Sequence, residues 1–242
     1  NVTLLKTQII PKSFISNSFG ENCNISEVVI KEGATVISES AFEKLWALVK
    51  ISIPNTVTGI ENNAFKGCSK LLDFEIPESV RIINESAFEN CCSLTNITIN
   101  GPLDTFGASA FNGCTKLSQI TFNGSIPAIR PLTFCNCASL KIINLPDTVQ
   151  SIGESAFKGC SNLPEIELPD RIASIEQQAF EGCSSLKAIK LPVNLKIINQ
   201  NIFNSCSSLE QIEIFESVTE IAGNAFTKCS SLKRITIPAG VT

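Results

Sequence analysis

The sequence predicts a right-handed solenoid of 23-residue coils, with one continuous parallel β-sheet of about ten strands along its concave side. Two observations carry this prediction. The first is a phenylalanine that returns every 23 residues, without insertion or deletion, from Phe19 to Phe226. The second is that other residue types keep step with it, in the pattern A-F-x-x-C-x-x-L-x-x-I-x-I-P-x-x-V-x-x-I-x-x-x. A fixed period of roughly 20–50 residues is typical of a solenoid, in which each repeat forms one coil.

The repeat divides into three local elements, counted from the phenylalanine as position 0. The run L-x-x-I-x-I has the alternation of a short strand with positions +9 and +11 inward. Proline at +12 ends this strand because it has no N–H to give to a ladder. The V-x-x-I step fits a second short extended segment on the opposite side. The A-F-x-x-C step has the length of one helical or 3₁₀ turn, preceded by polar residues such as Ser38, Asn84 and Asn199.

Stacking is required because one coil cannot bury its own apolar face. The phenylalanines then form the spine of the core, and we expect a single solenoid over residues 1–242. Residues 1–18 are interpreted as a degenerate, cap-like coil, because Pro11 precedes Phe19 by eight residues whereas Pro54 precedes Phe65 by eleven. Residues 19–242 read as regular coils that stop in mid-repeat, which indicates a fragment of a larger protein.

Eight of the eleven cysteines occupy position +3, an inward position that Leu45 fills in another coil. Stacked side chains point in parallel, which disfavours disulfide geometry, so we expect buried, reduced, metal-free thiols that act as small apolar groups. The remaining Cys23, Cys92 and Cys135 are candidates for reactive or paired thiols, or for plain surface thiols. The eight cysteines at +3 are Cys68, Cys91, Cys114, Cys137, Cys160, Cys183, Cys206 and Cys229.

Composition argues against several classes of function. The chain has no histidine and no tyrosine, so the commonest general base is missing, and we expect no catalytic residue, cofactor or metal. A net charge of −4, spread along the chain, gives no footprint for nucleic acid. No apolar stretch approaches the roughly 20 residues of a membrane span, so we expect no direct membrane insertion.

Two carboxylate pairs keep one remote enzymatic alternative open, because glycoside hydrolysis needs only two acids. Asp73 and Glu75 lie in one coil, and Glu165 and Glu167 lie in another coil four steps along the stack. A lysine one coil away from each pair gives a simpler interpretation, in which the acids form cross-strand charge pairs on a solvated face.

The outward strand positions, +8 and +10, vary from coil to coil. Extended concave surfaces are the usual binding faces of curved solenoids. We therefore predict a partner-binding concave face made of Lys50, Asp73, Glu75, Asn96, Gln119, Glu165, Glu167, Lys190, Gln211, Glu213 and Arg234.

Some residues depart from the repeat and are alternative contacts for a partner. Trp46 is the only tryptophan, and packing over the N-terminal coil explains it without a ligand. Phe215 replaces the proline at +12, and lying flat over a neighbouring proline is its simpler interpretation. Asn-Gly pairs at residues 100–101 and 123–124 also replace this proline, which predicts either a different turn or a local platform.

Residues 152–163, which read IGESAFKGCSNL, combine the isoleucine, Ala-Phe, cysteine and leucine positions of the repeat. This pattern resembles the BspA-like leucine-rich repeat surface proteins, also called the Treponema pallidum type, over residues 19–242. That family occurs in host-associated bacteria and trichomonad protists. The resemblance implies a leucine-rich repeat solenoid, an extracellular or cell-surface location, and adhesion to host proteins, matrix or other cells. It implies no catalytic motif.

The leading hypothesis is a non-enzymatic adhesion or recognition scaffold with a protein or cell-surface ligand. The alternative is a structural module that stacks within a longer repeat protein, with end-to-end self-association as its mode of assembly. A glycan hydrolase is the remote alternative.

Overall fold

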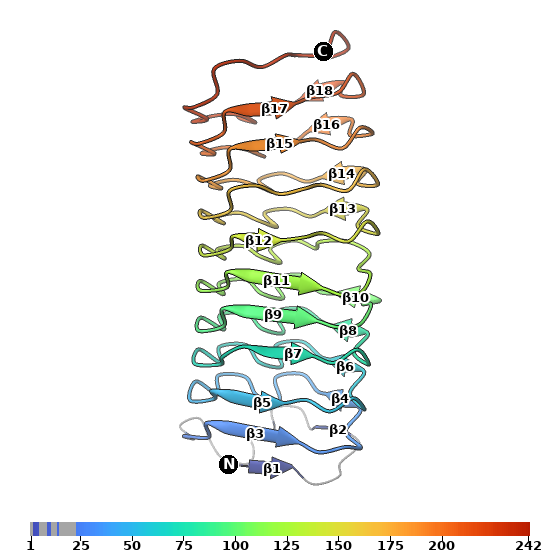
Figure 1. Cartoon of the computed structure of the whole chain (residues 1–242), viewed down its shortest axis with the longest axis vertical. Coiled ribbons are helices and arrows are strands. Elements are labelled where there is room, and N and C mark those ends of the chain that lie inside the picture. The colour runs from blue at the N-terminus through green and yellow to red at the C-terminus, as the bar shows by residue number, and fades with distance from the viewer. Residues whose placement is uncertain (1, 5–8, 11–13, 15–22) are drawn as a thin grey trace.

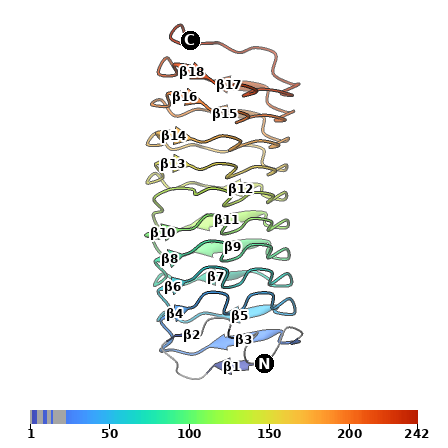
Figure 2. The same ribbon diagram turned by 180° about the vertical axis from the view of Figure 1, so that it is seen from behind.

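The computed structural model describes residues 2–4, 9–10, 14 and 23–242, which form a column of stacked coils (Figure 1). All strand pairs in the described part are parallel. The strands lie in two rows that run in opposite directions on two sides of the column (Figures 1 and 2). The chain rises from one coil to the next as a right-handed path, so the predicted parallel solenoid is confirmed.

The front row is formed by the L-x-x-I-x-I part of the repeat. Its inward residues are mostly isoleucines, and Ile97 and Ile120 are each 1% exposed. Successive side chains of a strand point to opposite faces, which explains why inward and outward positions alternate. The front row consists of β1 (Val2–Leu4), β3 (Glu27–Ile30), β5 (Lys50–Ser52), β7 (Phe74–Ile76), β9 (Asn96–Ile99), β11 (Gln119–Phe122), β12 (Ile142–Ile143), β15 (Ala188–Lys190) and β17 (Gln211–Glu213).

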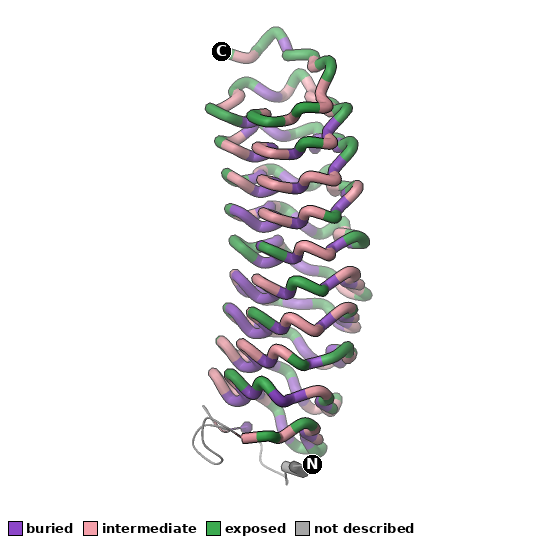
Figure 3. Tube along the Cα trace, turned by 90° about the vertical axis from the view of Figure 1, so that its left-hand side faces the viewer, coloured by how far each residue is buried: buried purple, intermediate pink, exposed green. Residues whose placement is uncertain are grey.

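The back row is formed by the V-x-x-I part of the repeat, as the sequence predicts. Isoleucines at +18, such as Ile60 and Ile83, are fully buried and close the core from this side. Buried and exposed residues alternate around each coil of the column (Figure 3). The back row consists of β2 (Ile9–Ile10), β4 (Val36–Ile37), β6 (Gly59–Ile60), β8 (Ile82–Ile83), β10 (Thr105–Phe106), β13 (Ser151–Ile152), β14 (Ser174–Ile175), β16 (Ile197–Ile198) and β18 (Glu220–Ile221).

Each row is divided into shorter sheets, which corrects the expectation of one continuous sheet. The front row separates into β1-β3-β5, β7-β9-β11-β12 and β15-β17. The back row separates into a five-stranded sheet, β2-β4-β6-β8-β10, and the pairs β13-β14 and β16-β18.

A proline lies at one break in each row. At position +7 of the front row, the backbone N–H normally donates a hydrogen bond to the carbonyl oxygen at +7 of the preceding coil. Ser118 donates to Thr95 in this way, at 2.7 Å. Pro164 occupies this position between β12 and β15 and has no N–H to donate. Pro127 stands in the equivalent donor position of the back row, where strand pairing stops after β10.

The A-F-x-x-C step is not helical, which corrects the predicted helical or 3₁₀ turn. No helix is present in residues 23–242, and the described residues contain none long and apolar enough to cross a membrane. Residues at −2 and +2 take positive φ instead, as Asn63 (57°) and Gly67 (75°) do on either side of Phe65. A helix needs consecutive residues with negative φ, so this alternation excludes it.

Hydrogen bonds between coils stabilise this unusual turn. The N–H groups at −2, 0 and +2 donate to carbonyls of the next coil, as Phe65 donates to Ala87 at 2.8 Å. The N–H groups at −1, +1 and +3 close local turns, as Cys68 donates to Phe65 at 3.1 Å. The bonds offset the roughly 1–2 kcal/mol that a left-handed conformation costs a residue with a Cβ atom. The coil therefore has a third line of inter-coil hydrogen bonds, outside its two strand rows.

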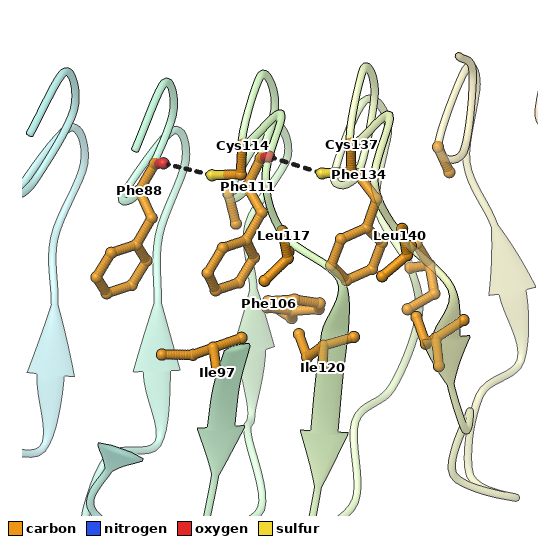
Figure 4. Packing of buried hydrophobic residues seen from close by; sticks show 14 of the residues in the cluster. Phe88, Ile97, Phe106, Phe111, Cys114, Leu117, Ile120, Phe134, Cys137 and Leu140 are labelled. Atoms are coloured by element: carbon orange, nitrogen blue, oxygen red, sulfur yellow. Dashed lines mark hydrogen bonds between the residues drawn. The ribbon is translucent and has the colours of Figure 1, made fainter. Parts of the chain in front are cut away.

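The phenylalanines stack as a continuous column of nearly parallel rings (Figure 4). From Phe42 to Phe226, neighbouring ring centroids lie 5.2–5.9 Å apart with interplanar angles of 2–18°. The widest separation, 5.9 Å, is between Phe111 and Phe134. Phe106 replaces the usual isoleucine at +18, and its ring centroid lies 6.1 and 6.0 Å from these two.

The N-terminal coil differs from the others in length. Val2 pairs with Val28, which lies 26 positions later instead of the regular 23. Phe14 contacts Phe42 edge-on, with centroids 6.4 Å apart and an interplanar angle of 72°. Phe19, which the sequence places first in the spine, lies outside the described residues.

The cysteines at +3 lie inside the core, and burial is confirmed for seven of the eight, with Cys229 half-buried. Each Sγ–H donates to the carbonyl oxygen of a phenylalanine 26 positions earlier, at 3.1–3.3 Å (Figure 4). Burial raises the pKa of all eight thiols, to about 12 for Cys206. A buried thiol with a raised pKa is a poor nucleophile, since the thiolate is the reactive form.

Removing one ring from the spine tests its contribution to stability. Phe157→Ala should lower the free energy of unfolding by about 3–5 kcal/mol, because it leaves a cavity between two stacked rings. Phe157→Leu is the control and should cost less, because it refills most of that cavity. Urea denaturation followed by circular dichroism measures both. A loss below about 1 kcal/mol for the alanine variant would contradict the role of the spine.

Thiol titration tests the burial of the cysteines. In the native protein, reaction should be confined to Cys23, Cys92 and Cys229, the three that are only half-buried. The others should react when denaturant is added, because unfolding exposes them and removes the cause of their raised pKa. Labelling with a chromogenic disulfide reagent, followed by peptide mass spectrometry, identifies the reactive residues. Rapid native labelling of Cys114 or Cys160 would contradict the packing.

Candidate functional site: the front face

The front face is the surface formed by the outward side chains at +8 and +10 of the front row. The structure exposes the predicted contact residues there, with Gln119 half-exposed. They extend along the stack from Lys50 to Arg234 and do not converge on one point. This arrangement suits contact with an extended partner more than a compact catalytic centre. The exposed members are Lys50, Asp73, Glu75, Asn96, Glu165, Glu167, Lys190, Gln211, Glu213 and Arg234.

Asp73 is held by the following coil, not by a lysine. Its Oδ1 accepts hydrogen bonds from the backbone N–H groups of Thr95 at 2.7 Å and Asn96 at 2.8 Å. Its Oδ2 accepts from the Thr95 hydroxyl at 2.7 Å and from Asn96 Nδ2 at 2.8 Å. Lys50, the lysine expected to pair with this acid, instead contacts Glu27 at 3.8 Å.

These hydrogen bonds set the charge state of Asp73. Partial burial raises the pKa of its carboxyl group, but donors from Asn96 and Thr95 outweigh this effect and lower the pKa below its ordinary value. The carboxylate therefore stays ionised and occupied by its neighbours, which suits a structural role and does not suit a general acid.

The two Asn-Gly pairs extend the strands of the front row. Without proline at +12, the N–H of Asn100 donates to Ile76 at 3.1 Å. The strands β9 and β11 accordingly reach four residues, and the side chain of Asn123 donates to that of Asn100 at 2.8 Å. Glycine is required after Asn100 because a Cβ atom on Gly101 would collide with the carbonyl oxygen of Glu78.

A shallow groove runs along the front face between β12 and the end of the chain, with a volume of about 820 Å³. Its floor includes Leu145, Leu168 and Ile214, half-buried side chains that pack on the core. Among the described residues, no backbone hydrogen bond joins residues 165–168 to either neighbouring coil, and Ala188 has a small side chain. The groove carries the charged side chains Asp147, Glu165, Glu167, Asp170, Lys190 and Glu213.

Trp46 and Phe215 each lie against a lysine. The Nζ of Lys70 lies 5.0 Å from the centroid of Trp46, which is 39% exposed. The Nζ of Lys190 lies 5.6 Å from the centroid of the half-buried Phe215. A cation over an aromatic face is attracted by the ring quadrupole. Trp46 is therefore accessible to a partner, whereas Phe215 positions Lys190.

The cysteines outside the +3 position differ in exposure. Cys135 is buried, while Cys23 and Cys92 are half-buried, and all three are free thiols. Burial raises the pKa of Cys135, and the nearby Lys158 lowers it by a smaller amount. In the described ranges, no three cysteine, aspartate or glutamate side chains gather closely enough to hold a metal ion.

Two features of the structure have sequence signals that the repeat pattern did not reveal. Glycine or asparagine is frequent at +2, which is the signal for a left-handed conformation in the turn. Pro164, at a position that donates in other coils, is the signal for the interruption beneath the groove.

The network around Asp73 leads to a prediction about pH. Thr95→Val combined with Asn96→Ala should raise the pKa of Asp73 towards its ordinary value, because the Thr95 hydroxyl and the Asn96 side-chain amide, two of its four hydrogen-bond donors, are removed. The network stabilises the fold above the ordinary pKa of aspartate, and this stabilisation disappears as the pH falls through the lowered value. The stability difference between wild type and the double variant should therefore narrow in acid. NMR titration of the Asp73 carboxyl carbon and unfolding at several pH values measure both effects. An unchanged pKa would contradict the network, and Ser118→Ala is the control.

Comparison with known proteins places this fold in a family. The model of the BspA type leucine rich repeat region, in 6 copies, matches residues 12–141 and 127–242. A leucine-rich repeat protein from Bacteroides ovatus shares 31% identity over 88% of this chain, with a TM-score of 0.66. The chain spans 61% of the length of that protein. No curated protein matches the sequence.

Two further solved structures are similar. A leucine rich cell surface protein from Faecalibacterium prausnitzii shares 27% identity, with 89% of this chain and 74% of that one covered and a TM-score of 0.50. The leucine-rich repeat protein of T. pallidum shares 23% identity, with 87% and 79% covered and a TM-score of 0.43. The family match extends over nearly the whole chain and agrees with the observed coils, strand rows and phenylalanine spine. The chain belongs to the BspA type leucine-rich repeat family.

Proposed function

We propose that this chain is a non-enzymatic recognition scaffold that presents its front face to a protein or cell-surface partner outside the cell. Family membership supports a repeat scaffold. The similar protein from Faecalibacterium prausnitzii is described as a cell surface protein, which supports the same location here.

The main support is the contrast between the two sides of the front strands. Inward positions repeat almost unchanged, as Ile97 and Ile120 do, because they must stack on one another. Outward positions change from coil to coil among acidic, basic, amide and hydroxyl side chains, with Ile142 and Ala188 as the apolar exceptions. These side chains are exposed at a regular spacing, so they offer a distinctive charge pattern without any cost to the core.

Charge patterns of this kind favour broad contact. Exposed ion pairs contribute about 0–1 kcal/mol each, so no single side chain on this face carries the affinity. Complementary charges still orient a partner and accelerate its association. Binding is therefore expected to be distributed over several coils and sensitive to salt.

The arrangement of the acids gives little support to glycoside hydrolysis. Asp73 has a lowered pKa and is occupied by Thr95 and Asn96. Glu165 and Glu167 project from one segment towards the same side, whereas the two acids of a glycosidase flank the scissile bond.

The test is to reverse charges in matched groups. The front variant reverses four exposed residues, Glu165, Glu167, Lys190 and Arg234, and keeps the net charge unchanged. The control variant reverses four exposed residues in or directly beside the extended segments of the back row, Arg130, Glu176, Lys196 and Glu220. The protein is used as bait in a pull-down from host matrix and cell extracts, and the captured partner is then measured by surface plasmon resonance.

The front variant should weaken binding by about tenfold or more, since charge reversal replaces attraction by repulsion. The back variant should leave the affinity within about twofold. Equal affinity for wild type and front variant, with loss in Trp46→Ala, would show that an irregular coil carries the contact. Light scattering over a concentration series separates partner binding from self-assembly.

A further inference from the structure

We infer that the groove on the front face binds an extended, lysine- or arginine-rich segment of a protein partner. This inference rests on the proposed function and names the chemistry of the ligand. The groove in question is the one of about 820 Å³ between β12 and the end of the chain.

The charge of the groove is the first reason. It is lined by five carboxylates and one ammonium group, whereas the whole chain has 23 acidic and 19 basic residues. The excess of four carboxylates in this one groove equals the net charge of −4 of the entire chain. No lysine or arginine in the described part of the chain forms an ion pair with any of the five. An external cation is therefore the complementary partner.

The lysine in the groove does not neutralise these acids. Lys190 lies between Glu167 and Glu213, which occupy the same +10 position in the two neighbouring coils. It forms an ion pair with neither, and its Nζ lies 5.6 Å from the centre of the Phe215 ring. Phe215 replaces the proline of the repeat, so this coil has exchanged a strand terminator for a ring that holds the ammonium group.

The floor of the groove matches the stems of basic side chains. Leu145, Leu168 and Ile214 line it and are only half-buried, so aliphatic surface lies beside the carboxylates. Lysine and arginine bury their methylene stems on apolar surface and keep the charged end group near polar partners. The groove offers an aliphatic surface for the stem and carboxylates for the charged end group. A cluster of acids alone would offer only the carboxylates.

The direction of the groove favours an extended ligand. Its lining residues come from successive coils, from Asp147 through Glu167 to Thr236, so it runs along the stack. It is open to solvent and has no aromatic residue in its lining, which is unlike a sugar-stacking site. A chain laid along it would pass acidic side chains in successive coils.

The other acidic pair provides an internal contrast. Asp73 has its two oxygens filled by Thr95 and Asn96, and Glu75 accepts from Asn100 at 3.1 Å. That pair is satisfied within the chain, whereas the groove acids make no side-chain hydrogen bond or ion pair within the described residues. The groove carboxylates are therefore free to bind an external cation, whereas Asp73 and Glu75 already accept hydrogen bonds from the protein.

The experiment measures a labelled hexalysine peptide by fluorescence anisotropy at low and physiological salt. The test variant is Glu165→Gln/Glu167→Gln/Glu213→Gln. The control is Glu32→Gln/Glu78→Gln/Glu85→Gln, which removes the same charge from exposed sites in earlier coils that are not among the predicted contact residues. The groove variant should weaken binding by about tenfold, and the control by about twofold or less.

Lys190→Ala gives a change of opposite sign. Removing the one cation of the groove should tighten hexalysine binding by about two- to threefold, an effect that unfolding or general weakening would not produce. Equal weakening in the groove and control variants would overturn the inference, since it would indicate diffuse attraction. No weakening in the groove variant would overturn it as well.

The inference and the proposed function fail separately. If the four-charge front variant loses the captured partner while the groove glutamine variant binds hexalysine like wild type, recognition by the front face stands and the basic ligand is wrong. If the captured partner binds the front variant as tightly as wild type, while hexalysine binding is lost in the groove variant, the groove assignment stands and the proposed front-face recognition is wrong.

Discussion

Register between coils is the constraint on which the rest of this structure depends. Each inward side chain packs on its equivalent in the next coil, and the phenylalanine rings repeat at 5.2–5.9 Å through the column. The two strand rows and the turn between them also take their hydrogen bonds from neighbouring coils. An inserted residue in one coil would displace its ring, its strands and its turn together, so the core tolerates little change in length or size.

Because stacking constrains the inward residues, the residue type can vary mainly at outward positions. The front strands fix where each outward side chain emerges but not which residue it is, and that freedom is what a recognition surface uses. The groove arises where the constraint relaxes. Pro164 removes one inter-coil donor, residues 165–168 lose their ladder, and Ala188 leaves space beside Lys190. Departures from the repeat are therefore the places where this scaffold gains an individual shape.

Much of the fold could be predicted from the sequence. The phenylalanine period predicted the spine, the inward position of Cys114 predicted its burial, and the alternation around Ile97 predicted which side chains face solvent. The predicted helical turn was wrong because the length of the segment does not fix the conformation of Asn63 and Gly67, which depends on carbonyls of the next coil. The continuous sheet was wrong for a related reason, since each ladder depends on donors in two coils at once.

The repeat pattern also did not predict which side chains hydrogen-bond to one another on the front face. Asp73 was expected to pair with a lysine, yet its neighbours Thr95 and Asn96 supply nearer donors. The sequence by itself determined the period, the inward rows and the residue types on the front face, because stacking requires identical neighbours at fixed spacing. Only the tertiary structure decided which acids are satisfied, where the ladders break and where a groove opens. Those outcomes depend on distances of a few ångströms between residues about 23 positions apart, and a linear pattern does not contain them.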